Sequence, residues 1–263
     1  HNLHTVCESA HCPNISECWS TGTATFMLMG DTCTRGCKFC AVKTGNPMGK
    51  LDLDEPKKLA QALAEIKLFD YVVLTSVNRD DLIDGGSSHF AECIKEIKKA
   101  YPEIIVEVLI PDFNGDIENL KKIVDANPEV IAHNIETIER LQRNIRDVRA
   151  NYKQSLSVLE NVKKLNPKIY TKSSIMLGLS ETDEEIIQSM KDLREIGVDI
   201  LTLGQYLRPT DWHIPINNFV APEKFEYFKQ KALEFGFLFC AAGPFVRSSY
   251  KAGELFMRNV IKG

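Results

Sequence analysis

The sequence predicts an α/β fold, an open partial (β/α)6 barrel whose parallel sheet is covered by helices. Apolar segments of strand length recur along the chain, and segments with helical periodicity lie between them. Because the apolar segments are nearly continuous rather than alternating, both faces of the sheet are expected to be buried. The units number six, too few for the eight of a complete barrel, so an open barrel is expected.

The strands are expected, in chain order, at 24–30, 71–77, 104–110, 130–135, 170–177, 200–206 and 237–243. A helix is expected after Pro56, where Leu59, Leu63 and Ile66 recur at helical spacing. The residues Thr-Asp-Glu-Glu at 182–185 match a capping box, which predicts the start of another helix. Strands and helices therefore alternate.

The composition is that of an ordinary globular chain. Of the 263 residues, 44% are hydrophobic and 26% are charged, and the net charge is −4. This balance gives no positive surface for nucleic acid or for an anionic membrane. Uncharged apolar stretches such as 23–30 are far shorter than the roughly 20 residues that cross a bilayer. We therefore expect neither nucleic acid nor a membrane among the partners.

The chain contains no linker-like or low-complexity stretch, so we expect one domain. The barrel is assigned to 23–243, and residues 1–22 and 244–263 are expected to pack on it as extensions. The sequence begins at His1 rather than Met, so a segment upstream of His1 is expected.

Cysteine is the unusual component of the sequence. Six of the eight cysteines lie between Cys7 and Cys40. A disulfide framework is typical of short secreted chains without a core, whereas this chain is long enough to form its own core. We therefore interpret the six as thiolate ligands in a reducing compartment, which favours a cytoplasmic location. Cys93 and Cys240 lie within apolar patterns and are expected to be core thiols.

The loop after the first predicted strand carries Cys33, Cys37 and Cys40 at C-x3-C-x2-C spacing. Parallel α/β folds place their functional groups at the carboxyl ends of strands. Three thiolates without a nearby fourth can hold a 4Fe-4S cluster and leave one iron open. A zinc ion takes four ligands and would need a distant histidine, which is the alternative interpretation.

This triplet resembles the signature of the radical S-adenosylmethionine enzymes. The resemblance implies that the open iron binds the methionyl part of S-adenosylmethionine. Reduction then cleaves the sulfonium to a 5′-deoxyadenosyl radical, which can take hydrogen from an unactivated C–H bond. The protein would position the reactants and exclude water.

A second triplet, Cys7, Cys12 and Cys18, lies upstream with C-x4-C-x5-C spacing. Alone it is ambiguous, because His4 or His11 could complete a zinc site. Together with the first triplet and with the segment 246–250, Val-Arg-Ser-Ser-Tyr, it resembles the lipoyl synthase family over essentially the whole chain. Further matching blocks lie at 75–82, 84–86, 133–137, 171–174, 178–182 and 204–207.

The resemblance implies an enzyme that inserts two sulfur atoms at C6 and C8 of an octanoyl chain on a carrier-protein lysine. Its cofactors would be S-adenosylmethionine and two 4Fe-4S clusters. Cys33, Cys37 and Cys40 would hold the catalytic cluster, and Cys7, Cys12, Cys18 and Ser248 would hold an auxiliary cluster that donates sulfur. Ser248 could equally cap a following helix. The implied partners are an octanoylated lipoyl-carrier protein or domain, an electron donor such as a ferredoxin or flavodoxin, and a protein that reloads the auxiliary cluster.

Five residues are candidates for the S-adenosylmethionine pocket: Gly85, Gly86, Arg146, Lys172 and Ser173. In radical enzymes Gly-Gly-Glu often contacts the methionyl amine, and here Ser follows the two glycines. A guanidinium suits the methionyl carboxylate. The alternative for the arginine is structural, because arginines at 140, 143, 146 and 149 recur every third residue, as on one solvated helical face.

Two other functions are compatible with the same cysteines. One is a radical enzyme that inserts sulfur into a free small molecule, which would need no surface for a carrier protein. The other is an electron-transfer protein with two clusters, which would need no S-adenosylmethionine pocket.

Overall fold

The structure is a computed structural model that describes residues 4–5, 14, 16, 18, 23–66 and 69–249 of the chain. Cys7, Cys12 and His11 lie outside the described residues. None of the helices in the described part of the chain is long and apolar enough to cross a membrane.

The strands are β1 (His4–Thr5), β2 (Thr23–Leu28), β3 (Thr32–Cys33), β4 (Lys43–Thr44), β5 (Tyr71–Ser76), β6 (Ile105–Leu109), β7 (Val130–Ala132), β8 (Tyr170–Leu177), β9 (Ile200–Gln205) and β10 (Phe239–Gly243). The helices are α3 (Glu55–Ile66), α4 (Ser87–Ala100), α5 (Ile117–Asp125), α6 (Gln142–Ile145), α7 (Tyr152–Leu165), α8 (Asp183–Glu195) and α9 (Pro222–Glu234). Two short 3-10 helices are η1 (Phe113–Gly115) and η2 (Glu139–Leu141).

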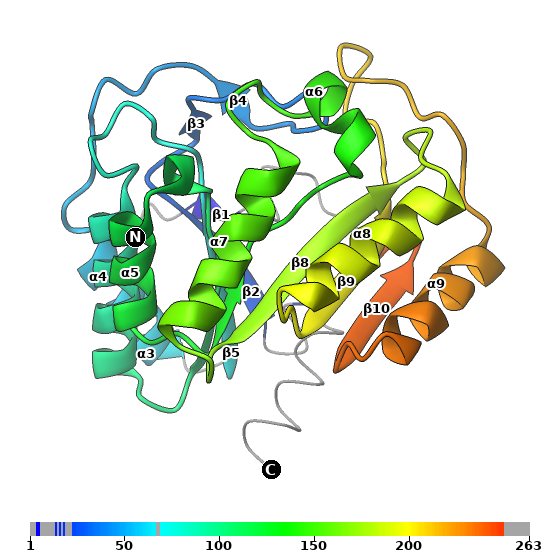
Figure 1. Cartoon of the computed structure of the whole chain (residues 1–263). Helices are drawn as coiled ribbons and strands as arrows, with labels where there is room; N and C mark the ends of the chain where they lie inside the picture. The colour runs from blue at the N-terminus through cyan, green and yellow to red at the C-terminus, as the bar shows by residue number, and fades with distance from the viewer. Residues whose placement is uncertain are drawn as a thin grey trace.

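The main sheet has eight strands in the order β1-β2-β5-β6-β7-β8-β9-β10. From β2 onward all neighbours are parallel, and β1 adds to the edge antiparallel to β2. Helices α3, α4, α5, α7, α8 and α9 each connect two successive parallel strands, so six β/α units are followed by a last strand. Figure 1 shows a curved, open sheet with these helices outside it. The predicted partial (β/α)6 barrel is confirmed.

The helix-facing side chains of the sheet form the core. Val72 and Leu74 of β5 pack in one cluster with Phe90 and Ile94 of α4, and all four are fully buried. A second cluster joins β8, β9 and β10 to α8 and α9. Complete burial of each such side chain contributes about 1.5–3 kcal/mol. The predicted core thiols, at positions 93 and 240, are members of these two clusters and are confirmed.

The predicted helix starts follow the local sequence. The Thr182 hydroxyl accepts the Glu185 N–H while the Glu185 carboxylate accepts the Thr182 N–H, so the predicted capping box forms.

The arginines at 140–149 do not lie on one face of a helix, which was the structural alternative for Arg146. Since η2 and α6 are short and the chain is extended at Arg146 (ψ 165°), no single helical face exists there. That alternative is wrong, and Arg146 is buried.

The side chains that point into the barrel include a buried charged group. Lys172 on β8 is 2% exposed, and its Nζ lies 2.7 and 3.0 Å from the two carboxylate oxygens of Glu107 on β6. The Tyr71 hydroxyl donates to the same carboxylate. The three residues form a closed polar group that neutralises its own charge, which is the condition under which a buried charge is tolerated.

We expect the variant Lys172→Met to lose about 3–5 kcal/mol of unfolding free energy, because it leaves the Glu107 carboxylate buried without its cation. The double variant Lys172→Met, Glu107→Gln should recover most of this loss, since the amide carbonyl still accepts the Tyr71 hydroxyl. Denaturant unfolding of the parent and of the single and double variants measures both values. A double variant no more stable than Lys172→Met would contradict the assignment.

Candidate active site

The cysteine loop lies at the carboxyl ends of the parallel strands. Cys33 ends β3, which pairs with β4 in a small separate sheet, and Cys37 and Cys40 follow in the same loop. All three side chains are partly exposed. Figure 1 shows β3, β4 and α6 together at one end of the barrel, beyond the carboxyl ends of β8 and β10. This is the position expected from the parallel topology.

Backbone N–H groups point at the cysteine sulfurs. The Sγ of Cys33 accepts from the N–H of Arg35 at 3.4 Å and of Asn78 at 3.3 Å. The Sγ of Cys37 accepts from the N–H of Asp147 at 3.3 Å. These donors orient the two sulfurs, and the hydrogen bond from Asp147 lowers the pKa of the Cys37 thiol.

Burial acts in the opposite direction on two of the thiols. It raises the pKa of Cys37, and it raises the pKa of Cys40 to about 12. At neutral pH these two thiols are therefore protonated until a cation replaces the proton. Iron ions supply that charge, so loading of the site releases protons.

The donor set of the loop fits a cluster better than a single ion. The loop supplies three thiolates, and the compact group of metal-binding side chains found among the described residues, Glu55, His89 and Cys93, does not include them. Three soft thiolates can hold a 4Fe-4S cluster and leave one iron open, whereas a structural zinc ion takes four ligands.

Arg35 ties the cysteine loop to two neighbouring strands. Its side chain is 3% exposed and forms paired hydrogen bonds with Asp80 at 2.9–3.0 Å and with Asp112 at 2.7–2.8 Å. Burial alone would raise the pKa of both carboxyl groups, but the guanidinium outweighs it and holds the pKa of each below its usual value. Asp80 follows β5 and Asp112 follows β6, so this one side chain joins three strand-end loops.

The other side of the loop is held by residues that follow β7 and β9. The Gly36 N–H donates to the Asp147 carboxylate at 2.9 Å. His213 lies 3.0 Å from the Cys40 carbonyl through Nε2, and its Nδ1 lies 2.8 Å from the Thr210 hydroxyl. The carbonyl can only accept, so Nε2 carries the proton and Nδ1 accepts from Thr210. His213 therefore fixes the backbone of Cys40.

A buried polar group lies beside the triplet, after β7. Arg146 donates through Nη1 to Ser155 at 2.8 Å, while its buried Nε–H has no partner among the described residues. The Asn134 amide donates to Glu136 at 3.1 Å, and its own buried oxygen likewise has no described partner. Burial raises the pKa of Glu136, and the charges of Arg146 and Glu136 both act on the Cys37 thiol. A cationic donor and two acceptors thus lie next to the cysteines.

The other candidates for the S-adenosylmethionine pocket make internal contacts. Gly85 and Gly86 have positive φ and form the turn into α4, where a Cβ on Gly86 would lie 2.3 Å from the Met29 sulfur. The Ser173 hydroxyl donates to the His133 carbonyl at 3.0 Å and accepts the Ile135 N–H at 3.2 Å. Ser173 therefore supports the backbone on which Asn134 and Glu136 are placed. The ammonium of the lysine at 172 is paired inside the barrel, as described above.

The two terminal segments meet at the same end of the barrel. The Asn14 amide donates to the Phe245 carbonyl at 2.8 Å, and the Cys18 N–H donates to the Asn14 carbonyl at 2.9 Å. The carbonyl of Val246 lies so close to β9 that a Cβ on Gly204 would be 2.2 Å from it. Cys18 is buried and the serine at 248 is partly buried in the turn that follows. These contacts join the segment that contains Asn14 and Cys18 to the segment that leads from Phe245 to Ser248. The residues after 249, where a capped helix was the alternative, lie outside the described part.

Sequence reasoning missed several residues of the site. Arg35 lies between Cys33 and Cys37, where the motif indicates a role for the cysteines alone. His213 lies in a loop without a motif. Asn134 and Glu136 lie in a block that contributed to the family resemblance but received no role. A charged or amide side chain directly after a strand of a parallel sheet is the signal that could have identified them.

Known proteins match this chain over almost its full length. The family model described as "Radical SAM superfamily" matches residues 27–193. The lipoyl synthase of Halobacterium salinarum is 60% identical over 266 residues, which cover 99% of this chain and 85% of that protein. The apicoplast lipoyl synthase of Plasmodium falciparum is 55% identical over 260 residues, which cover 99% of this chain and 62% of that protein. The chain thus spans about three fifths of the length of the Plasmodium relatives that it matches.

Among solved structures, the hydrogenase maturase HydG from Carboxydothermus hydrogenoformans has a similar fold. The TM-score is 0.62 at 14% identity, over 90% of this chain and 66% of that chain. At this identity the likeness concerns the fold alone. The extent and identity of the sequence matches show more: the chain belongs to the radical S-adenosylmethionine superfamily and, within it, to the lipoyl synthase family.

Proposed function

We propose that this chain catalyses the insertion of two sulfur atoms, at C6 and C8, into an octanoyl chain attached to a carrier-protein lysine. The observation that carries the proposal is the Asn14–Phe245 hydrogen bond, which joins the segment of the second cysteine triplet to that of Ser248 at the barrel end where the first triplet lies. A second ligand set near the first is what a sulfur donor beside a radical centre requires.

The cofactors of this family are S-adenosylmethionine and two 4Fe-4S clusters. Cys33, Cys37 and Cys40 are the proposed ligands of the first cluster, and Cys7, Cys12, Cys18 and Ser248 those of the second. With its cofactors bound, the first site supplies the 5′-deoxyadenosyl radical that removes hydrogen atoms from the substrate.

The protein's own groups would recognise the methionyl end of S-adenosylmethionine. The Nε–H of Arg146, which has no partner among the described residues, is a donor for the carboxylate, and the Asn134 oxygen and the Glu136 carboxylate are acceptors for the ammonium. The ammonium would also offset the desolvation that raises the Glu136 pKa. Gly85 and Gly86 keep their proposed backbone role. Lys172 and Ser173 stay predicted pocket residues, with the internal contacts described above.

Ser248 gives the second site a distinct chemistry. An alkoxide is a hard ligand in a set of soft thiolates, so its bond to iron should break first. A cluster that is consumed as a sulfur source benefits from one labile ligand. The proposed protein partners are the octanoylated carrier, an electron donor such as a ferredoxin or flavodoxin, and a protein that reloads the second cluster.

The cytoplasmic location stays a prediction. Relatives are named for the apicoplast and the mitochondrion, and others carry no compartment in their names.

The experiment that tests the function separates the two cysteine triplets. The protein is reconstituted anaerobically with iron and sulfide and supplied with reductant, S-adenosylmethionine and an octanoyl-lysine peptide. Cys37→Ala should abolish 5′-deoxyadenosine, because the first cluster loses one of three ligands. Cys12→Ala should still produce 5′-deoxyadenosine but no thiolated peptide. Chromatography of the nucleoside and mass spectrometry of the peptide measure both products.

The control is Cys240→Ala, which removes a core thiol and should leave both products in place. Normal thiolation by Cys12→Ala, with iron for one cluster only, would exclude sulfur donation from the second site. Failure of the parent with both the peptide and an octanoylated carrier protein would favour a free small molecule as the substrate.

The two adjacent serines give a sharper test of the second site. Ser248→Ala should reduce dithiolated peptide much more than 5′-deoxyadenosine, because only the second cluster loses a ligand. Ser249→Ala should change both products mildly. The two variants are assayed side by side, and a reversed ranking, or full dithiolation by Ser248→Ala, excludes Ser248 as the ligand.

Arg35→Lys should weaken the first site although it keeps the charge. An ammonium cannot form the paired hydrogen bonds to both Asp80 and Asp112, and we expect a loss of about 2–3 kcal/mol in stability. The rate of 5′-deoxyadenosine formation should fall about tenfold, because a less rigid loop positions the first cluster less well. Arg140→Lys is the control, because Arg140 pairs with Glu185 away from the cysteine loop while it is 53% exposed. Equal effects of the two variants would show that Arg35 has no special role.

A further inference from the structure

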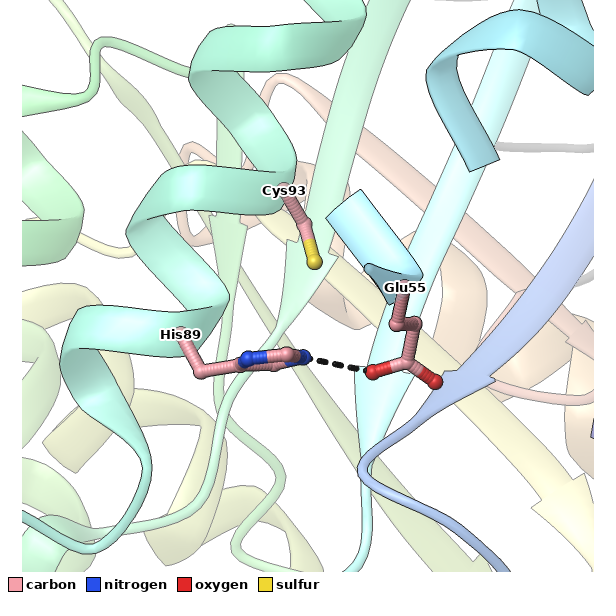
Figure 2. Close-up of side chains that lie close together, drawn as sticks. All are labelled: Glu55, His89 and Cys93. Carbon is pink, nitrogen blue, oxygen red and sulfur yellow. Dashed lines mark hydrogen bonds and ion pairs between the residues drawn. The ribbon is translucent and has the colours of Figure 1, made fainter. Parts of the chain in front are cut away.

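A buried group outside the proposed cofactor site lies where α3 and α4 begin beside the end of β2. It consists of Glu55, the first residue of α3, with His89 and Cys93 on one face of α4. Their side chains point toward one another in Figure 2, and they are 7%, 9% and 0% exposed. The proposed function uses none of the three.

The distances identify this group as a hydrogen-bonded pair with a thiol beside it. Glutamate, histidine and cysteine are ligands that zinc accepts. However, Nε2 of His89 lies only 2.6 Å from Oε2 of Glu55. Two ligands with zinc bonds of about 2.0–2.1 Å lie roughly 3.3 Å apart in a tetrahedral site. The Glu55 carboxylate is also already occupied, since the Met29 N–H donates to it at 3.0 and 3.3 Å.

The contact with Met29 leads directly to the cysteine loop. Met29 follows β2 and has a φ of 66°, in the left-handed region that few residues other than glycine adopt. The Met29 carbonyl accepts from Nη1 of Arg79 at 3.3 Å, so both backbone polar groups of this residue are held by buried side chains. Four residues later the chain reaches Cys33. The direction in which the chain leaves β2 is therefore one of the constraints on where Cys33 lies, together with the contacts of the loop itself.

The pair is well placed to hold this turn. Glu55 lies in the first turn of α3, where the helix dipole favours a negative charge. His89 comes from a different helix and fixes the orientation of the carboxylate, because its ring contacts one of the two oxygens. The carboxylate then spans from α4 to the end of β2.

We propose that His89 is a positioning residue that acts through Glu55 on the backbone of Met29 and thereby fixes Cys33 in the cluster loop. Among the described hydrogen bonds, the His89 ring contacts Glu55 and none of the three cysteines of the loop. The inference rests on the proposed function only in taking Cys33 as a cluster ligand; the contact chain from His89 to Met29 is independent of it.

The first measurement follows the contact itself. Hydrogen exchange of the Met29 amide is recorded by NMR for the full-length chain and for His89→Leu, which removes the ring and its hydrogen bond. Exchange should become about tenfold faster, because Met29 loses an acceptor that is fixed in place. His89→Gln retains a donor and should restore much of the protection, and it also serves if the leucine variant does not fold.

Cys93→Ala is the matched control, since Cys93 lies one turn further along α4 and is fully buried beside the pair, while its thiol forms no described hydrogen bond with Glu55 or His89. It should leave the Met29 amide as protected as in the parent. Unchanged exchange in His89→Leu overturns the proposal. So does stoichiometric zinc binding by the parent that Cys93→Ala and His89→Leu both abolish, because the group is then a metal site.

The second measurement concerns the reconstituted protein. His89→Leu should alter the EPR spectrum of the reduced first cluster in the presence of S-adenosylmethionine and lower 5′-deoxyadenosine formation about tenfold. His89→Gln should return both toward the parent, and Cys93→Ala should change neither. An unaltered spectrum and rate in His89→Leu, despite faster exchange at Met29, overturns the effect on the cluster. A parent that forms no 5′-deoxyadenosine contradicts the proposed function, while the exchange measurement still decides the contact chain.

Discussion

The buried guanidinium of Arg35 is the interaction on which the arrangement of the site depends. The cysteine loop has almost no secondary structure of its own, because β3 and β4 are two residues each. Its position is set by contacts with other loops, and Arg35 makes the strongest of them, with Asp80 and Asp112. A planar cation between two carboxylates in a buried place has few alternative geometries. The loop therefore inherits the rigidity of the strands β5 and β6.

The strands and helices of the barrel could be predicted because the sequence pattern of each element lies within the element itself. Continuous apolar segments and helical periodicities each report burial of the residues that carry them, and β5, β8 and β9 were predicted to within one residue of their ends. The strand expected at 130–135 is shorter than predicted. It stops at Ala132, and the following residues turn toward the site, with Glu136 at a φ of 66°. Apolar content alone does not report such a turn.

The site was predictable in part. The spacing of Cys33, Cys37 and Cys40 indicated a cluster by itself, whereas the roles of the upstream triplet and Ser248 came from family resemblance. The contacts that complete the site join residues far apart in sequence: Glu55 and His89 are 34 positions apart, and Arg35 and Asp112 are 77 apart. Lys172 is a further example. It was predicted as a pocket residue, but it pairs with Glu107 on another strand, and nothing in the sequence near the lysine indicates that partner. Such pairings depend on the register of the barrel, which periodicity does not define.

The contact of Asn14 with Phe245 has a consequence for the order in which the two cluster sites can form during synthesis. The described hydrogen bonds of the first cysteine loop extend no further along the chain than Ile214. The segment around Asn14 and Cys18, by contrast, meets a partner that is 231 positions later and is therefore synthesised long after it. Domains fold as their residues leave the ribosome, and contacts of large sequence separation form last. The contacts of the first cysteine loop can thus form early on a nascent chain, whereas the contact that joins the Asn14 segment to Phe245 has to wait until the later residues have been synthesised.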